Sequence, residues 1–215
     1  MCVDPKPFGN GKQPEATAYN RPIEPSVDIL ILCTGNICRS PMAEALLRER
    51  LRERGVHASV SSAGLSFHDR PATDDAIATA NGYGLDLRDH RSRLLAPELV
   101  ERADLVLAME LLHAREAIVL ADGALSKTFT LKELVRRARA EGHREDGESL
   151  DDWLARVSTG RKAIDLLGES HDDDVADPYR SSSKVYAACI AELDALVRDL
   201  VNLAWPPAAE NEGAA

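Results

Sequence analysis

The chain has 215 residues, of which 44% are hydrophobic, and its formal charge is −10 at pH 7. This length suits one domain with additions or two small domains, and the hydrophobic fraction is ample for a core. No hydrophobic run approaches the length of a membrane span. The negative charge argues against a broad nucleic-acid or anionic-membrane surface, and four irregularly placed cysteines do not resemble a disulfide framework.

The first 26 residues contain five prolines among glycines and polar residues, without hydrophobic periodicity. We expect an extended or disordered tail there and a second tail over residues 206–215. Residues 29–32 form a short apolar run with the β-branched content of a buried parallel strand. An amphipathic helix follows, for which the sequence predicts Ser40 as N-cap and Pro41 at the first helical position.

The loop between this strand and helix begins at Cys33 and ends at Arg39. Unpaired amides and the helix dipole favour an anion at a helix N-terminus. Gly35 permits a positive φ and Asn36 tolerates one, so the loop amides can converge into a cradle. Such a cradle would stabilise Cys33 as a thiolate nucleophile, and Ser40 could donate its hydroxyl to the sulfur. Arg39 offers a planar fork of donors to two oxygens of one phosphoryl group.

Three other interpretations of this loop are less favoured. A cysteine followed six residues later by an arginine also arises by chance. Nucleotide sites use the same strand, loop and helix, but they need G-x-G-x-x-G or G-x-x-x-x-G-K-[ST], and neither motif occurs here. Cys33 and Cys38 could form half of a metal site, yet no second Cys/His pair stands at ligand spacing. We therefore expect nucleophilic attack on phosphorus with no metal and no cofactor.

Further elements alternate along the chain. The sequence predicts strands and helices over these residues: strands 57–62, 103–109 and 126–129, and helices 73–81, 111–120, 131–140 and 183–203. Thr73 is the expected cap of its helix. Such alternation implies an α/β fold, a four-stranded parallel sheet flanked by helices on both faces. Arg136, Arg137 and Arg139 are interpreted as a solvated face, His113 as a surface residue, and Cys189 as a core residue.

Residues 141–169 interrupt this alternation. They begin with a polar stretch and then become amphipathic, so we expect a loop followed by one or two short helices packed against the body. We treat residues 27–205 as a single domain with this insertion. Neither the role of the insertion nor the oligomeric state can be predicted from the sequence.

The segment Cys33-Thr-Gly-Asn-Ile-Cys-Arg-Ser-Pro-Met-Ala-Glu44 resembles the active-site signature of the low-molecular-weight protein tyrosine phosphatases. Weaker motifs of that family follow in the same order: Ser62-Ala-Gly64, His90-x-Ser-Arg93, Ala103-Asp-Leu-Val-Leu-Ala-Met109 and Asp177-Pro-Tyr179. The resemblance covers residues 27–134 and 172–203, and the insertion has no counterpart in it. It implies the phosphotyrosine phosphatase I-like fold and hydrolysis of phosphotyrosine through a phosphocysteine intermediate.

The resemblance also implies site residues. Cys33, Arg39 and Asp177 would be catalytic, and Pro178 favours an extended Asp177 that can act as general acid. Phe67 and Tyr179 would form the walls of the substrate cleft, and His90 would support the loop near Asn36. The phosphate-binding residues would be Thr34, Gly35, Asn36, Ile37, Cys38 and Ser40.

Three other functions are compatible with the sequence. An arsenate reductase of the same fold needs further cysteines, and only Cys2 and Cys189 are available. Relatives that act on phosphoarginine carry Thr at the position of Ile37, which makes a phosphoarginine phosphatase less favoured. A non-enzymatic phosphotyrosine-binding protein would be expected to have lost a catalytic residue. The expected partner is a phosphotyrosine-containing protein, such as a tyrosine kinase, in the cytoplasm, where thiols stay reduced and signalling by dephosphorylation occurs.

Overall fold

The computed structural model describes residues 26–168 and 171–207, so the predicted tails lie outside it except for residues 26, 206 and 207. It contains one four-stranded sheet with the strand order β2-β1-β3-β4, and every pairing is parallel. The strands are β1 (Val27–Cys33), β2 (Ala58–Gly64), β3 (Leu105–Ala108) and β4 (Thr128–Thr130). The first strand is therefore central, and its last residue is Cys33.

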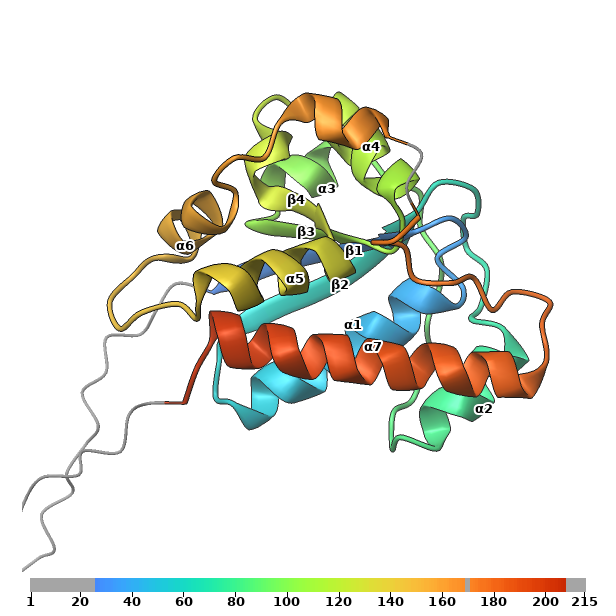
Figure 1. The fold of residues 1–215 in the computed structure, drawn as a ribbon. Helices are drawn as coiled ribbons and strands as arrows, with labels where there is room; N and C mark the ends of the chain where they lie inside the picture. The colour runs from blue at the N-terminus through green and yellow to red at the C-terminus, as the bar shows by residue number, and fades with distance from the viewer. Residues whose placement is uncertain (1–25, 169–170, 208–215) are drawn as a thin grey trace, which may run out of the picture.

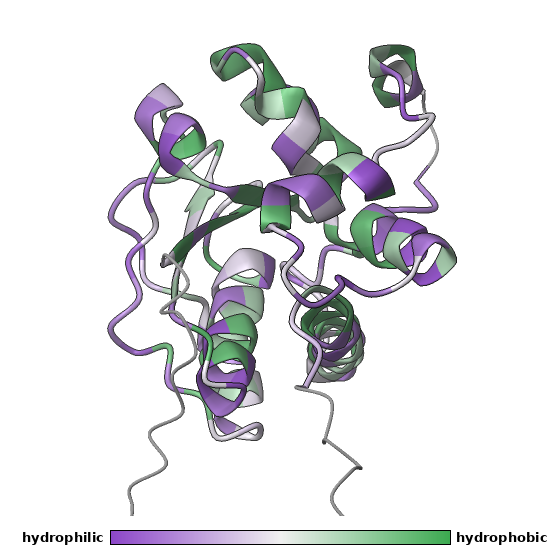
Figure 2. Ribbon diagram, turned by 90° about the vertical axis from the view of Figure 1, so that its left-hand side faces the viewer, coloured by the Kyte–Doolittle hydropathy of each residue, from purple (hydrophilic) through white to green (hydrophobic). Residues whose placement is uncertain are grey.

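Alternate residues of β1 point into two hydrophobic layers. Ile29 and Ile31 belong to the larger core, whereas Leu30 and Leu32 belong to the smaller one. The helices of the larger layer are α1 (Arg39–Glu53), α2 (Asp74–Asn81), α5 (Leu131–Glu141), α6 (Leu150–Val157) and α7 (Ser183–Ala204). Those of the smaller layer are α3 (Pro97–Arg102) and α4 (Leu111–Leu120). Figures 1 and 2 show helices on both sides of a hydrophobic sheet, which confirms the predicted fold.

Element boundaries differ from the prediction at a few points. Helix α1 begins at Arg39, so its cap position is Cys38, and no side chain caps it. The hydroxyl of Ser40 contacts Cys33 instead. A short 3-10 helix, η1 (Ala124–Lys127), occupies the first part of the predicted fourth strand, and the six-residue helix α3 was not predicted. Thr73 caps α2 as expected, accepting the Ala76 amide at 3.2 Å.

The arginines of α5 do not form a free solvated face. Arg136 forms an ion pair with Asp173 at 2.6 Å, and Arg139 is paired with Asp199. Arg137 lies 3.0 Å from Glu133, one turn earlier in the helix. The side chains of Arg136 and Arg139 are 60% exposed, as predicted, whereas Arg137 is mostly buried. The ion pairs were not predicted because two of the acidic partners are distant in sequence and come close only through the fold.

The insertion packs against α5 and η1, and one of its side chains reaches β4, an edge strand of the sheet. It contains α6 and a second 3-10 helix, η2 (Ala163–Leu167). Trp153 is fully buried, and Arg161 donates to the carbonyls of Leu125 (2.6 Å) and Thr128 (2.7 Å). The Arg161 guanidinium also stacks over Phe129, 4.4 Å from the ring centroid. An exposed edge strand can pair with other chains, so the insertion protects this edge.

Among residues 26–168 and 171–207, no helix is long and apolar enough to cross a membrane.

Candidate active site

The loop that joins β1 to α1 is held in a tight curve. Asn36 has a φ of +52°, a left-handed conformation that asparagine tolerates better than most residues. The loop also packs against the end of β2. A Cβ atom on Gly64 would lie 2.8 Å from the Asn36 nitrogen and 2.9 Å from the Thr34 oxygen, so only glycine fits there. The curve directs the backbone amide of Asn36 toward the Cys33 sulfur.

Two donors converge on the sulfur of Cys33: the Asn36 amide at 3.2 Å and the Ser40 hydroxyl at 3.0 Å. The direction of the second bond follows from the neighbours. The Arg93 amide donates to Asn36 Oδ1 at 3.0 Å, so the other end of this side chain is the amino group. That group donates to Ser40 Oγ at 3.0 Å and to Ser62 Oγ at 2.7 Å. Because Ser40 Oγ already accepts a proton, its own hydrogen is free to point at the sulfur.

A second group of contacts fixes Asn36 itself. His90 Nε2 lies 2.7 Å from the Asn36 carbonyl oxygen, which can only accept, so Nε2 carries the proton. Ser62, which accepts from Asn36, donates to Glu44 Oε2 at 2.5 Å. The structure thus brings His90 to the asparagine, as predicted, and adds Glu44 as the final acceptor.

Arg39 is 1% exposed and has a partner for each end of its fork. Its Nη1 donates to Glu110 and to the Val175 carbonyl (2.9 Å), and its Nη2 forms an ion pair with Asp177 at 3.0 Å. The same Nη2 lies 3.4 Å from Thr34 Oγ1. Burial lowers the pKa of Arg39, but the hydrogen bond and charge of Glu110, with the charge of Asp177, raise it above its ordinary value. The buried guanidinium is therefore a fixed cation.

His113 is buried beside this cation, not at the surface as predicted. Its Nε2 lies 3.0 Å from Thr34 Oγ1, whereas its Nδ1 has no hydrogen-bond partner among the described residues. Burial, assisted by the charge of Arg39, lowers the pKa of His113 to about 4. The imidazole is therefore neutral near pH 7.

Glu110 and His113 were not predicted as site residues. A signal for both was available, because they directly follow β3, and parallel strands end at the same edge of a sheet.

The segment carrying Asp177 is tied to the end of β3. The Val175 amide donates to the Met109 carbonyl at 2.8 Å, and Asp174 Oδ1 accepts the Leu111 amide at the start of α4 at 2.8 Å. Asp174 thus has a structural role at the start of α4. These bonds place Asp177, whose side chain is 45% exposed, next to Arg39 at the mouth of the site.

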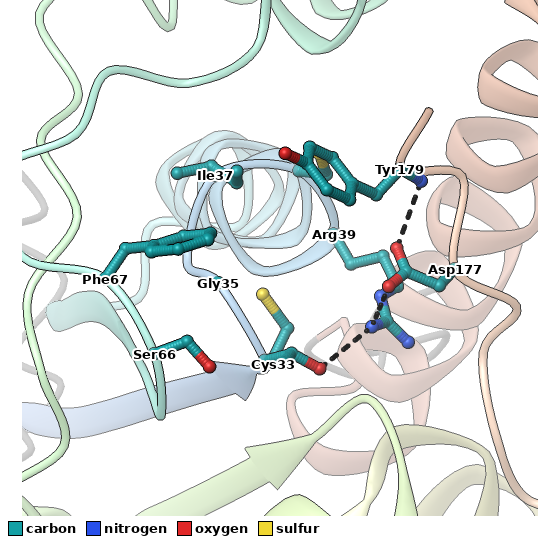
Figure 3. A pocket seen from close by; sticks show the side chains of 10 residues that line it. Cys33, Gly35, Ile37, Arg39, Ser66, Phe67, Asp177 and Tyr179 are labelled. Atoms are coloured by element: carbon teal, nitrogen blue, oxygen red, sulfur yellow. Dashed lines mark hydrogen bonds and ion pairs between the residues drawn. The ribbon is translucent and has the colours of Figure 1, made fainter. Parts of the chain in front are cut away.

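The pocket above Cys33 has a volume of about 120 Å³, and its lining includes the predicted wall residues. Figure 3 shows the rings of Phe67 and Tyr179 on either side of the space above the sulfur, with Ile37 near both. Gly35 leaves room for one wall, because a Cβ there would lie 3.1 Å from Phe67. The arrangement suits a planar aromatic group whose anionic end reaches the loop.

The other two cysteines of the described residues are buried. Cys38 Sγ lies 3.4 Å from both Thr73 Oγ1 and the Tyr186 hydroxyl, and burial raises the pKa of Cys38. Burial likewise raises the pKa of Cys189 to about 12. Burial therefore disfavours the thiolate form of both side chains, so neither is expected to attack the substrate.

Comparisons with known proteins point to one family. Residues 28–152 match the family model described as low molecular weight phosphotyrosine protein phosphatase. The chain is 38% identical over 133 residues to the probable low molecular weight protein-tyrosine-phosphatase EpsP of Ralstonia solanacearum, covering 61% of this chain and 89% of that protein. It is 34% identical over 177 residues to a protein-arginine-phosphatase of Bacillus subtilis, covering 81% and 94%. The crystal structure of the low molecular weight protein tyrosine phosphatase from T. tengcongensis has a TM-score of 0.63 and 31% identity, covering 82% of this chain and 99% of that one.

Proposed function

Because the chain belongs to the low molecular weight protein tyrosine phosphatase family, we propose that it hydrolyses phosphotyrosine in proteins through a phosphocysteine intermediate. One observation carries this proposal: the Cys33 sulfur faces an aromatic-walled pocket and receives two hydrogen-bond donors, next to a buried arginine. This combination supplies a nucleophile, an anion site and a place for a phenyl ring.

In the first step the Cys33 thiolate attacks phosphorus. The P–O bond to the phenol breaks, and the leaving oxygen takes the electron pair and the proton of Asp177. The loop amides of residues 34–39 and the Arg39 fork hold the three equatorial oxygens, on which charge accumulates in the transition state.

In the second step a water molecule attacks the phosphocysteine. Asp177, now ionised, takes a proton from this water, and the S–P bond breaks to release phosphate and restore the Cys33 thiolate. Glu110 and the Val175 carbonyl hold Nη1 of Arg39, which supports a role in which Nη2 turns from Asp177 to the phosphate.

The nature of the substrate depends on Ile37. One relative is named a protein-arginine-phosphatase, so phosphoarginine has to be considered. Ile37 is nearly buried and lines the pocket beside Phe67 and Tyr179. Its apolar surface leaves the N–H groups of a guanidinium leaving group without a partner, which is costly in a desolvated site. A phenyl ring has no N–H group that would be left without a partner there. The side chain of phosphoserine is too short to bring its phosphate to the pocket floor.

The arsenate reductase alternative lacks support from the thiols. Such a reaction passes oxidation from the first cysteine to others, but Cys189 is 5% exposed and burial raises its pKa to about 12. Cys2 lies outside the described residues.

The proposed partner is a phosphotyrosine-bearing protein, such as a tyrosine kinase whose own phosphotyrosines are substrates. A reactive thiolate keeps its activity in a reducing compartment, so we place the enzyme in the cytoplasm.

The substrate is tested with phosphotyrosine, phosphoserine and phosphoarginine peptides of otherwise equal sequence, assayed at matched concentration. We expect kcat/KM to be highest for phosphotyrosine, and Ile37→Thr to raise turnover of phosphoarginine relative to phosphotyrosine. Preference of the unmodified protein for phosphoarginine would contradict the assignment.

The mechanism is tested with Asp177→Asn. Poor leaving groups such as phenol need the proton, whereas activated phenols do not, so the variant should slow hydrolysis of phenyl phosphate more than that of p-nitrophenyl phosphate. Equal losses on both would show that Asp177 is not the general acid.

A further inference from the structure

An arginine lies over each aromatic wall of the pocket. The Arg70 guanidinium is 5.5 Å from the centroid of Phe67, and the Arg180 guanidinium is 5.2 Å from that of Tyr179. Both arginines are exposed, and neither has an ion-pair partner within residues 26–168 and 171–207. A protein with a net charge of −10 thus presents two unpaired cations at the mouth of its pocket.

The backbone at Arg180 is strained. Its φ is +62°, in the left-handed region that side chains other than glycine, asparagine and aspartate rarely adopt. The Ser181 amide donates to the Pro178 carbonyl at 2.9 Å, which makes Arg180 the third residue of a tight turn. Type II turns need a positive φ there and favour glycine. A strained arginine where glycine would be free of strain suggests a use for the side chain.

The other charges near the mouth differ between the two walls. On the Phe67 side, Asp74 and Asp75 line the same groove as Arg70 and offset its charge; His68 and Asp69 lie just before it in the chain. Tyr179 borders the same groove, but Arg180 does not line it. Asp177, three residues before Arg180, is already paired with Arg39. Arg180 is therefore the less compensated of the two cations.

We propose that Arg180, with a smaller contribution from Arg70, selects phosphotyrosines that have an anionic group one or two residues away. This inference rests on the proposed function. When the substrate ring lies between Phe67 and Tyr179, the neighbouring residues of the peptide pass over the rim where the guanidiniums lie. The planar fork of arginine binds a carboxylate or a second phosphate with two parallel hydrogen bonds.

The test compares four phosphotyrosine peptides that differ only in the flanking positions: alanine, glutamate, lysine or a second phosphotyrosine. We expect kcat/KM to be about two- to five-fold higher for the glutamate peptide than for the alanine peptide, as for other exposed ion pairs, and higher still for the second phosphotyrosine. The preference should appear in KM, because contacts remote from the reacting bond are made equally in ground and transition states. It should weaken at 0.5 M salt.

Variants separate the side chain from the backbone. Arg180→Asn removes the charge but keeps a residue that tolerates the left-handed conformation, so the ratio between glutamate and alanine peptides should fall toward one. Arg180→Lys keeps the charge and should retain most of the ratio. Arg198→Ala removes an exposed arginine that lies about 22 Å along α7 from the start of that helix, and it should not change the ratio.

The outcomes are distinct. No turnover of any phosphotyrosine peptide would reject the proposed function. Equal turnover of the alanine, glutamate and second-phosphotyrosine peptides, or a preference that survives in Arg180→Asn, would reject only the role of Arg180. A preference confined to the second phosphotyrosine would support the proposal and identify phosphate as the flanking anion.

Discussion

Asn36 offers a way to separate the stability of the phosphate loop from its chemistry. Its side chain is fully buried and makes three hydrogen bonds, to Arg93, Ser40 and Ser62. In Asn36→Ala each lost bond should cost about 1 kcal/mol, and alanine in the left-handed region about 1 kcal/mol more. The free energy of unfolding should therefore fall by about 4 kcal/mol.

Asn36→Asp should behave differently. Aspartate tolerates the left-handed conformation and keeps the oxygen that accepts the Arg93 amide, so the loss of stability should be only about 1–2 kcal/mol. Its second oxygen, however, accepts where the amino group donated. Ser40 would then donate to this carboxylate and no longer to Cys33, and a negative charge would lie near the sulfur. The loss of one donor to a reacting anion costs about 100-fold in kcat.

The assay combines urea unfolding with kcat on p-nitrophenyl phosphate. Unfolding can be followed by the fluorescence of the buried Trp153 and Trp205. Asn81→Ala, at an exposed helix end, is the control and should change neither quantity. We expect the aspartate variant to be more stable than the alanine variant but no more active. If the aspartate variant kept more activity than the alanine variant, the assigned direction of the Ser40 bond would be wrong.

Two further predictions concern His113 and Cys38. Since the pKa of His113 falls from 6.5 in the unfolded chain to about 4 in the fold, stability should be full above pH 6.5 and decrease by about 3 kcal/mol as the pH falls toward 4. Unfolding curves across that range should lose most of this slope in His113→Asn, and an unchanged slope would exclude His113 as its source. Activity lost to mild peroxide should return with dithiothreitol, less so in Cys38→Ser, if Cys38 traps oxidised Cys33 as a disulfide. Cys189→Ala should recover like the unmodified protein, and equal recovery in all three would remove Cys38 from this role.

The phosphate loop could be predicted because it is contiguous. Cys33, Gly35, Asn36 and Arg39 are separated by a few residues, and a loop that enters a helix orients them by local geometry alone. The strand before it and the helix after it could be predicted from hydrophobic periodicity, which is clear in long elements. Short elements such as α3 and β4 contain too few residues to show a hydrophobic period.

Residues that act from other elements were harder to predict. Glu110, His113 and Asp174 are polar and lie in segments that look exposed in the sequence. Their burial or pairing depends on Arg39 and on the start of α4, which only the tertiary fold brings to them. In each case the partner is more than 60 residues away in sequence. The pattern of neighbouring residues in the sequence does not indicate contacts between segments that far apart.

The charges around Arg39 connect binding to catalysis. In the structure Arg39 neutralises one of two carboxylates, Glu110 and Asp177, so the three side chains together carry one negative charge when both acids are ionised. A phosphate dianion that takes the place of Asp177 at Nη2 adds charge next to a thiolate, and a proton on Asp177 relieves the repulsion. Glu110 keeps its ion pair with Nη1, whereas Asp177 would lose its own. The proposed mechanism therefore assigns the proton to the carboxyl that the substrate displaces, next to the leaving oxygen.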